Sequence, residues 1–214
     1  MGIKGIIFDS DGVIFDSESV HYLAFKEAFL RYNYELTTNH FEKLKGMSSK
    51  DIILDCFPNA KDDFMNSLSK ERSELFVKKY SSMAPLIKGI KKFIDYLKDN
   101  NYKIIVVTNG LRENSLALMK HHELDLNVLS VQDFIKPKPD PAGYLMALEK
   151  LSLNANEAVV FEDSLLGIIA AKSAGIMTFG VMSKHNAEEL IEAGADYAIE
   201  DFSNLDKLIE VLNL

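Results

Sequence analysis

Short apolar runs alternate with longer helical patterns along most of the chain. The runs are rich in β-branched residues and too short for helices, so they predict buried strands. They occupy residues 3–8, 103–108, 158–163 and 176–181, with a weaker run at 197–199. Apolar residues recur at helical spacing over 87–100, 113–122, 141–151 and 165–174. This alternation is typical of an α/β fold, and we expect a Rossmann-like, doubly wound, mainly parallel sheet.

Residues 18–81 break the alternation. Tyr22, Phe25, Phe29 and Tyr32 follow helical spacing, further helical patterns cover 51–56 and 62–80, and no convincing strand interrupts them. We therefore expect a small all-helical cap domain at 18–81, inserted into an α/β core formed by 1–17 and 82–214. Ligands of open α/β sheets bind beyond the carboxyl ends of the strands, so the cleft between cap and core is expected there.

Composition narrows the class of protein. Of 214 residues, 47% are hydrophobic and 26% are charged, which is typical of a globular chain. The formal net charge of −8 argues against nucleic acid as a partner, because such binding rests on Lys and Arg. No apolar run approaches the roughly 20 residues that a membrane span needs. Asp9 and Asp11 interrupt the apolar N-terminus, so we expect no signal peptide and a cytoplasmic location. The single cysteine, Cys56, excludes an internal disulfide and is expected to be a buried apolar residue.

Acidic pairs follow two of the predicted strands. Asp9 and Asp11 come directly after the first strand and, two residues apart in extended chain, point the same way. Taken alone, the pair favours the simpler interpretation of a polar strand end that leads into a turn at Gly12. Glu162 and Asp163 end a second buried strand, and parallel strand ends meet at one edge of a sheet. Convergent carboxylates repel one another and suit Mg²⁺, which prefers oxygen ligands.

The same edge is expected to hold a hydroxyl and an ammonium group. Thr108 and Asn109 follow the strand at 103–108, and Lys136 lies in a proline-rich loop before a helix. Carboxylates, Mg²⁺, a hydroxyl and a lysine together describe a phosphoryl-transfer site, because the cations offset the repulsion between a carboxylate nucleophile and a phosphate.

Four motifs in this order resemble the haloacid dehalogenase superfamily, in its branch of β-phosphoglucomutase-like phosphatases with a helical cap. They are Asp9-Ser10-Asp11-Gly12-Val13, Thr108, Lys136-Pro137-Lys138-Pro139-Asp140 and Phe161-Glu162-Asp163-Ser164. The resemblance covers essentially the whole chain and is least specific in the cap.

The resemblance implies a role for each matched residue. Asp9 matches the nucleophile that becomes an aspartyl phosphate, and Asp11 matches the general acid/base, whose backbone carbonyl also ligates Mg²⁺. Thr108 matches the hydroxyl that orients the phosphoryl group, and Lys136 matches the lysine that neutralises nucleophile and phosphate.

The remaining matches concern the metal and the phosphoryl pocket. Glu162 and Asp163 match the acidic metal pair, with Asp163 favoured as the direct ligand. Asn109 and the backbone amides of Ser10 and Gly12 are expected to complete the phosphoryl pocket.

The cap matches less closely. Residues 44–49 resemble the specificity loop of β-phosphoglucomutase, but Ser49 stands where that enzyme has an arginine that grips a second phosphate. Lys45 is either a substrate contact or a solvated lysine. His21 matches a position that is histidine in the mutase and in many capped phosphatases. Family members also have glycine before the motif lysine, where Lys136 is preceded by Ile135.

The expected function is Mg²⁺-dependent hydrolysis of a small phosphorylated metabolite, a sugar phosphate, by a monomer or weak homodimer. A sugar-phosphate mutase is the alternative within enzymes, and Ser49 argues against it. A haloacid dehalogenase is less expected, because Asp11, Glu162 and Asp163 would have no purpose without a metal. A non-enzymatic phospho-aspartate signalling module is the alternative of another class, and it does not explain the helical insertion.

Overall fold

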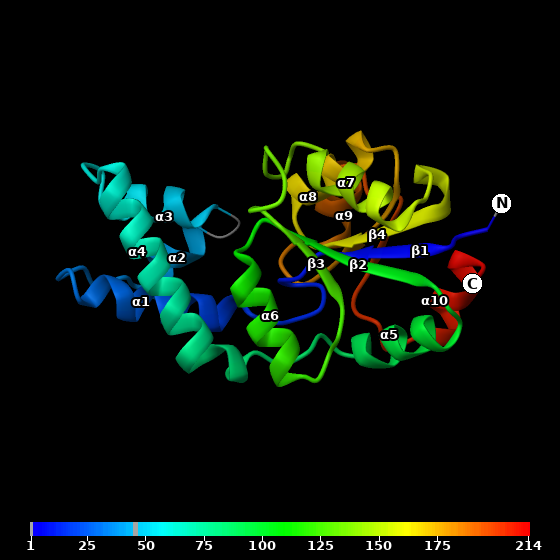
Figure 1. Ribbon diagram of the computed structural model, residues 1–214, viewed down its shortest axis with the longest axis horizontal. Helices are drawn as coiled ribbons and strands as arrows, with labels where there is room; N and C mark the ends of the chain where they lie inside the picture. The colour runs from blue at the N-terminus through cyan, green and yellow to red at the C-terminus, as the bar shows by residue number, and fades with distance from the viewer. Residues whose placement is uncertain (1, 45–46) are drawn as a thin grey trace.

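The computed structural model describes residues 2–44 and 47–214. In this part of the chain a parallel sheet of six strands has the order β3-β2-β1-β4-β5-β6 (Figure 1). The strands are β1 (Gly5–Phe8), β2 (Lys103–Thr108), β3 (Asn127–Ser130), β4 (Ala158–Glu162), β5 (Met177–Val181) and β6 (Tyr197–Ile199). The chain therefore starts in the middle of the sheet and winds outward in both directions, as expected of a doubly wound fold.

The central strand is buried on both faces. β1 pairs with β2 on one side and with β4 on the other, so that Phe8 lies beside both Val106 and Phe161. Ile6, Ile7 and Phe8 are fully buried, which explains why this strand appears in the sequence as a continuous apolar run. The register also places the residues that follow Phe8 and Phe161 side by side at the carboxyl edge.

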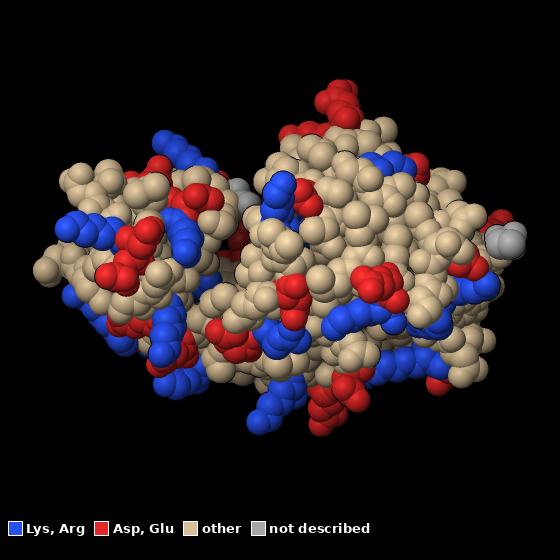
Figure 2. Space-filling view, turned by 45° about the horizontal axis from the view of Figure 1, so that its top comes forward, with Lys and Arg blue, Asp and Glu red and all other residues tan. Residues whose placement is uncertain are grey.

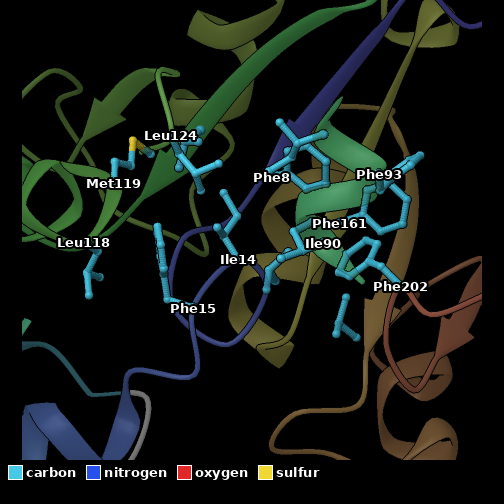
Figure 3. Close-up of a cluster of buried hydrophobic side chains, with 14 of the residues drawn as sticks. Phe8, Ile14, Phe15, Ile90, Phe93, Leu118, Met119, Leu124, Phe161 and Phe202 are labelled. Carbon is cyan, nitrogen blue, oxygen red and sulfur yellow. The ribbon is translucent and has the colours of Figure 1, made fainter. Parts of the chain in front are cut away.

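One face of the sheet is covered by α5 (Ile90–Asp99), α6 (Arg112–His121) and α10 (Leu205–Leu212). Phe8, Phe93, Phe161 and Phe202 gather in this layer of the core, among aliphatic side chains (Figure 3). Phe8 stacks on Phe161 with ring centroids 5.5 Å apart, and Phe93 of α5 meets the edge of Phe8 at 6.0 Å. These large rings hold β1 and β4 firmly against α5.

The other face is covered by α7 (Ala142–Leu151) and α8 (Leu165–Ser173). Ile7, Val107 and Val160 point to this side, opposite to their neighbours along the strands. The short helix α9 (Ala187–Glu192) and the 3₁₀ turn η3 (Ala155–Glu157) complete the core.

A helical lobe lies to one side of the sheet (Figure 1). It contains α1 (Glu18–Leu30), α2 (Thr38–Leu44), α3 (Ser49–Cys56), α4 (Asp62–Leu75), the π-helical turn η1 (Phe76–Tyr80) and the 3₁₀ turn η2 (Ser81–Met83). Phe25, Phe29, Ile53 and Leu68 belong to a hydrophobic cluster of its own, in which Cys56 is buried as expected. The domain boundaries proposed from the sequence, 17/18 and 81/82, stay a prediction.

The predicted fold class is confirmed, with two differences in detail. β3 was not expected, because its apolar core is only Val128 and Leu129. The helix expected over 62–80 is α-helical to Leu75 and continues as the π-helical turn η1. Within the described residues, every helix is too short or too polar to cross a lipid bilayer.

Candidate active site

The carboxyl ends of β1, β2 and β4 meet the helical lobe at a cavity of about 220 Å³. The cavity opens in the hollow between the two lobes (Figure 2). Its walls include Asp9, Asp11 and Asp163 from the sheet side and Ser49 and Arg72 from the helical side. The backbone amide of Asp9 donates to the carbonyl of Phe161 at 2.9 Å, which brings the two acidic pairs together. Parallel pairing thus produces the predicted convergence of carboxylates.

The lysine that contacts Asp9 in this cavity is Lys138, which corrects the expectation of Lys136. The ammonium of Lys138 lies 2.5 Å from Asp9 Oδ1 and 2.6 Å from Glu162 Oε1, and its side chain is 5% exposed. Lys136 is 71% exposed and approaches Asp140 at 3.7 Å. Lys136 is thus a solvated surface residue.

Two backbone contacts explain why Lys138 enters the site. Its backbone N–H donates to Asn109 Oδ1 at 3.0 Å, and Asn109 Nδ2 donates to its carbonyl at 3.4 Å. Its ammonium also donates to the carbonyl of Val107 at 3.0 Å. Because the sequence repeats Lys-Pro at 136–139, either lysine could match the motif lysine, and in the structure it is the second, Lys138. The residue before the site lysine is therefore Pro137, and Ile135 is a 97% exposed loop residue.

Glu162 orients this lysine, and its expected place among the metal ligands stays a prediction. Its Oε1 accepts from Lys138 and, at 3.3 Å, from the hydroxyl of Tyr144. Its Oε2 accepts from the backbone and hydroxyl of Ser164 at 2.8 and 2.9 Å. Burial opposes ionisation, but Lys138 and Ser164 outweigh it and lower the pKa of Glu162. Both oxygens are occupied by protein donors.

Asp11 is held by two donors from the start of the helical lobe. Ser17 Oγ donates to Asp11 Oδ1, and His21 Nε2 lies 3.0 Å from the same oxygen. Burial penalises the carboxylate, but His21 and the hydrogen bonds of both donors outweigh this, so the pKa of Asp11 is lowered. The ring of His21 stacks on Phe76 with centroids 4.4 Å apart, which fixes its orientation.

Asp163 has two partners from the loop after β5. Ser183 Oγ donates to Asp163 Oδ2 at 2.7 Å, and the ammonium of Lys184 lies 3.0 Å from the same oxygen. Neither partner was expected. Both follow the carboxyl end of β5, however, and the other site residues were found by looking at the carboxyl ends of strands. Burial lowers the pKa of Lys184, but Asp163, Asp11 and Asp9 outweigh it and raise that pKa.

Of the other residues expected in the phosphoryl pocket, Thr108 lies on the cavity wall, whereas Ser10 and Gly12 make contacts with other protein groups. Thr108 is buried on the cavity wall, and its Oγ1 accepts from the backbone of Gly110 at 2.9 Å. The hydroxyl of Ser10 lies 3.2 Å from that of Ser115, and the expected part of the Ser10 backbone amide in the pocket stays a prediction. The amide of Gly12 donates to the carbonyl of Phe15 at 2.7 Å, so its expected part as a free phosphoryl donor is corrected.

Gly12 is instead required by its backbone. Its φ is +81°, and a Cβ there would lie 1.9 Å from Asp163 Oδ2. Glycine is therefore the residue that lets the loop after β1 approach the second acidic pair.

Arg72 of α4 was not expected in the cavity wall, where it is 3% exposed. Its Nη2 donates to Ser49 Oγ at 2.5 Å, and its Nη1 lies 3.2 Å from His21 Nδ1. Its place in a polar helix offers no sequence signal for burial. Lys45, expected as a substrate contact or a solvated lysine, lies outside the described residues.

The donor set fits Mg²⁺. Asp9, Asp11 and Asp163 offer carboxylate oxygens, the hard ligands that this ion prefers. Burial raises the pKa of Asp9 above its usual range, and neighbouring carboxylates add to this against the opposing charge of Lys138. Burial and Glu162 likewise raise the pKa of Asp163, although Lys184 opposes them. This surplus of buried negative charge is what a divalent cation would neutralise.

The fold and this edge define an α/β enzyme whose chemistry lies at the carboxyl ends of parallel strands, under a helical lobe. A family model described as haloacid dehalogenase-like hydrolase matches residues 6–181, so the chain belongs to that family. The expected superfamily and the expectation of an enzyme are thereby confirmed.

Known relatives match the chain over nearly its whole length. A phosphorylated carbohydrates phosphatase from Thermotoga maritima is 28% identical over 98% of this chain and 100% of its own. A β-phosphoglucomutase from Bacillus subtilis is 29% identical over 95% of this chain and 92% of its own. The crystal structure of a hydrolase from Pseudomonas syringae superposes with a TM-score of 0.82 and 25% identity, covering 97% of this chain and 98% of that one.

Proposed function

We propose that this protein is a Mg²⁺-dependent phosphatase that hydrolyses a small phosphorylated metabolite, a sugar phosphate, through an aspartyl phosphate on Asp9. The observation that supports this most directly is the buried ammonium of Lys138, 2.5 Å from Asp9 at the carboxyl edge of the sheet. The T. maritima relative, whose name describes a phosphatase of phosphorylated carbohydrates, points to the same substrate class.

Asp9 acts as the nucleophile in this proposal. Its carboxylate attacks phosphorus in line with the leaving oxygen and forms an acyl phosphate, which water later hydrolyses. Lys138 reduces the repulsion between this carboxylate and the incoming phosphate, and Glu162 keeps the lysine in place. Asp9, Asp11 and Asp163 would hold Mg²⁺, which supplies further charge neutralisation at the transferred phosphoryl group.

Asp11 handles the protons. Its lowered pKa makes it a base before substrate binds, which is the form that accepts a proton from water in the second step. The negative charge of a bound phosphoryl group favours the protonated form, which then donates its proton to the leaving oxygen in the first step. His21 and Ser17 hold the carboxylate in position for both transfers.

The helical lobe acts as the cap. It contributes Ser49 and Arg72 to the cavity wall, while the sheet contributes the carboxylates and the lysine. Contacts to the part of the substrate that departs therefore come from the cap, and exclusion of bulk water protects the acyl phosphate.

A sugar-phosphate mutase is the second candidate, since the B. subtilis relative bears that name. The two reactions share the aspartyl phosphate and differ in its acceptor, which is water in a phosphatase and a sugar hydroxyl in a mutase.

The proposal is tested with a panel of sugar phosphates, scored by kcat/KM for phosphate release with Mg²⁺ and with a chelator. We expect Mg²⁺-dependent release by the wild type and none by Asp9→Asn, which retains the fold. Sustained release by Asp9→Asn would refute the assignment of the nucleophile. Isomerisation of β-glucose 1-phosphate in the presence of its bisphosphate, without net phosphate release, would favour the mutase.

A further inference from the structure

Three side chains of metal-binding type converge in the helical lobe, outside the walls of the cavity described above. His40 belongs to α2, and Asp55 and Cys56 are the last two residues of α3. One donor atom of each, a ring nitrogen, a carboxylate oxygen and the thiol sulfur, all lie within 4.8 Å of one another. The imidazole and the carboxylate are in direct contact, with His40 Nε2 2.7 Å from Asp55 Oδ2. The two helices thus bring the three usual kinds of zinc ligand to one point.

The spacing of these atoms is close to that of a metal site. Tetrahedral Zn²⁺ with ligand bonds of about 2.0–2.3 Å holds its donor atoms roughly 3.3–3.7 Å apart. From their distances in the structure, the nitrogen and the oxygen would separate by roughly 0.7 Å, and the sulfur would approach by about 1 Å. Small side-chain rotations supply such shifts. His40 and Asp55 are 33% and 43% exposed, so an ion can reach them from solvent.

Tyr34 supplies the outer contacts that such a site needs. Its hydroxyl lies 3.0 Å from His40 Nδ1, the ring nitrogen that does not face Asp55. Burial and a hydrogen bond with Cys56 raise the pKa of Tyr34 to about 12, so the hydroxyl keeps its proton. His40 Nδ1–H can therefore donate to the phenol oxygen while the phenol donates to the sulfur. A hydrogen bond at the second ring nitrogen fixes the tautomer that leaves Nε2 free for a metal.

Cys56 needs a cation to become a ligand. It is the only cysteine of the chain and is 6% exposed. Burial raises the pKa of its thiol and Asp55 adds to this, although Tyr34 opposes them, so the thiol keeps its proton at neutral pH. A bound divalent cation reverses this balance, because a coordinating thiol is deprotonated. The metal–sulfur bond forms as the S–H bond breaks, the proton passes to solvent, and no oxidation state changes.

We propose that His40, Asp55 and Cys56 form a zinc site that cross-links α2 and α3. A thiolate and an imidazole favour Zn²⁺ over Mg²⁺, which prefers a set of oxygen ligands such as that of the cavity. Three protein ligands leave a fourth position for water. The site takes no part in phosphoryl transfer, so the inference does not depend on the proposed function. Bound zinc would stabilise the helical lobe, because it joins two of its helices.

Titration with Co²⁺ tests the site directly. Co²⁺ accepts the tetrahedral geometry of Zn²⁺ and gives a thiolate-to-metal charge-transfer band in the near ultraviolet, which carboxylate and imidazole ligands do not give. Because Cys56 is the only cysteine, this band reports one site. With a non-thiol reductant and excess Mg²⁺ to occupy the cavity carboxylates, we expect the band to saturate at one equivalent of Co²⁺ and to disappear when Zn²⁺ is added. Absence of the band, or its persistence in Cys56→Ser, would overturn the proposal.

Further variants separate the ligands from the surroundings. His40→Ala should abolish the band at one equivalent of Co²⁺. His185→Ala is the matched control, because His185 lies 3.3 Å from Glu189 in an exposed histidine–carboxylate pair of the other lobe, and it should leave the band unchanged. Tyr34→Phe should weaken Zn²⁺ binding in calorimetric titration by about 10–100-fold, the usual cost of losing an outer hydrogen bond. A full band in His40→Ala, or equal losses in His40→Ala and His185→Ala, would overturn the proposal.

Thermal melting gives a readout that needs neither absorbance nor turnover. In excess Mg²⁺, Zn²⁺ at 100 times its dissociation constant should raise the Tm of the wild type by about 5–11 °C. The same addition should leave the Tm of Cys56→Ser unchanged, with circular dichroism as the check that this variant is folded. His40→Ala, at a partly exposed position, repeats the comparison if Cys56→Ser does not fold. An equal rise in Tm in the wild type and the variant would place the zinc elsewhere and overturn the proposal.

Discussion

Lys138→Ala would leave Asp9 and Glu162 without the ammonium group that they share. Both contacts are short, 2.5 and 2.6 Å, and the lysine side chain is 5% exposed. Removing one partner of a buried ion pair costs about 3–5 kcal/mol. For a chain of about this size, each kcal/mol lowers Tm by about 2–4 °C, so we expect a loss of roughly 6–20 °C.

The same substitution should abolish most of the activity. Loss of one preorganised charge contact at a transition state typically lowers kcat by about 10²–10³-fold. Lys136→Ala is the matched control two residues away, because its exposed side chain makes a 3.7 Å contact with Asp140. An exposed pair of this kind contributes about 0–1 kcal/mol, so this variant should retain both Tm and kcat/KM.

Two assays check this prediction. Calorimetric melting in a chelator measures stability without metal, and phosphate release with Mg²⁺ measures activity. The loss of Tm in Lys138→Ala should shrink at low pH, because protonation of Asp9 and Glu162 removes the uncompensated charge. The reasoning is refuted if Lys136→Ala is the inactive variant, or if Lys138→Ala melts and turns over like wild type.

Two further predictions concern the surroundings of the site. Gly167→Ala would place a Cβ 1.9 Å from a buried oxygen of Glu162, so it should lower both Tm and activity, while Gly2→Ala, with no atom within 4 Å of its added Cβ, should change neither. Thermal melting and phosphate release of the two variants decide this, and equal behaviour would contradict it. His21→Phe keeps a ring but removes a donor to Asp11, so the lowered pKa of that carboxyl should rise. As the pH is lowered, Asp11 then becomes protonated at a higher pH than in the wild type, and the ionised form needed for the second step is lost earlier. In single-turnover experiments, the low-pH limb of aspartyl-phosphate hydrolysis should move up by roughly one to two pH units. An unchanged limb would contradict this.

Long apolar runs made the sheet predictable. The strand at 103–108 has the predicted bounds. Its run of apolar, β-branched residues is too short for a helix, so a strand buried on both faces was the interpretation that remained. β3 escaped prediction because two apolar residues at the edge of a sheet resemble a loop. The acidic residues of the site were predictable for a related reason, since parallel strands that end in Asp9 and Glu162 must bring them to one edge.

Residues that act from loops and from the helical lobe were not predictable in this way. The choice between Lys136 and Lys138 depends on the clamp by Asn109, a contact between segments distant in sequence. The burial of Arg72 depends on the packing of α4 against α1 and α3, where it contacts His21 and Ser49, and its helix is polar in composition. Periodicity describes the faces of single elements and does not report which faces meet.

The most direct test of the account is detection of the phosphoryl group on Asp9. The enzyme is mixed with Mg²⁺ and a sugar phosphate that it hydrolyses, and the reaction is quenched in acid within one turnover. The protein is then digested, and its peptides are analysed by mass spectrometry. We predict that the peptide containing Asp9 gains the mass of one phosphoryl group, that hydroxylamine removes it, and that Asp9→Asn shows no such gain. Phosphate release at the wild-type rate with no phosphorylated peptide, or with the label on another residue, would contradict the account.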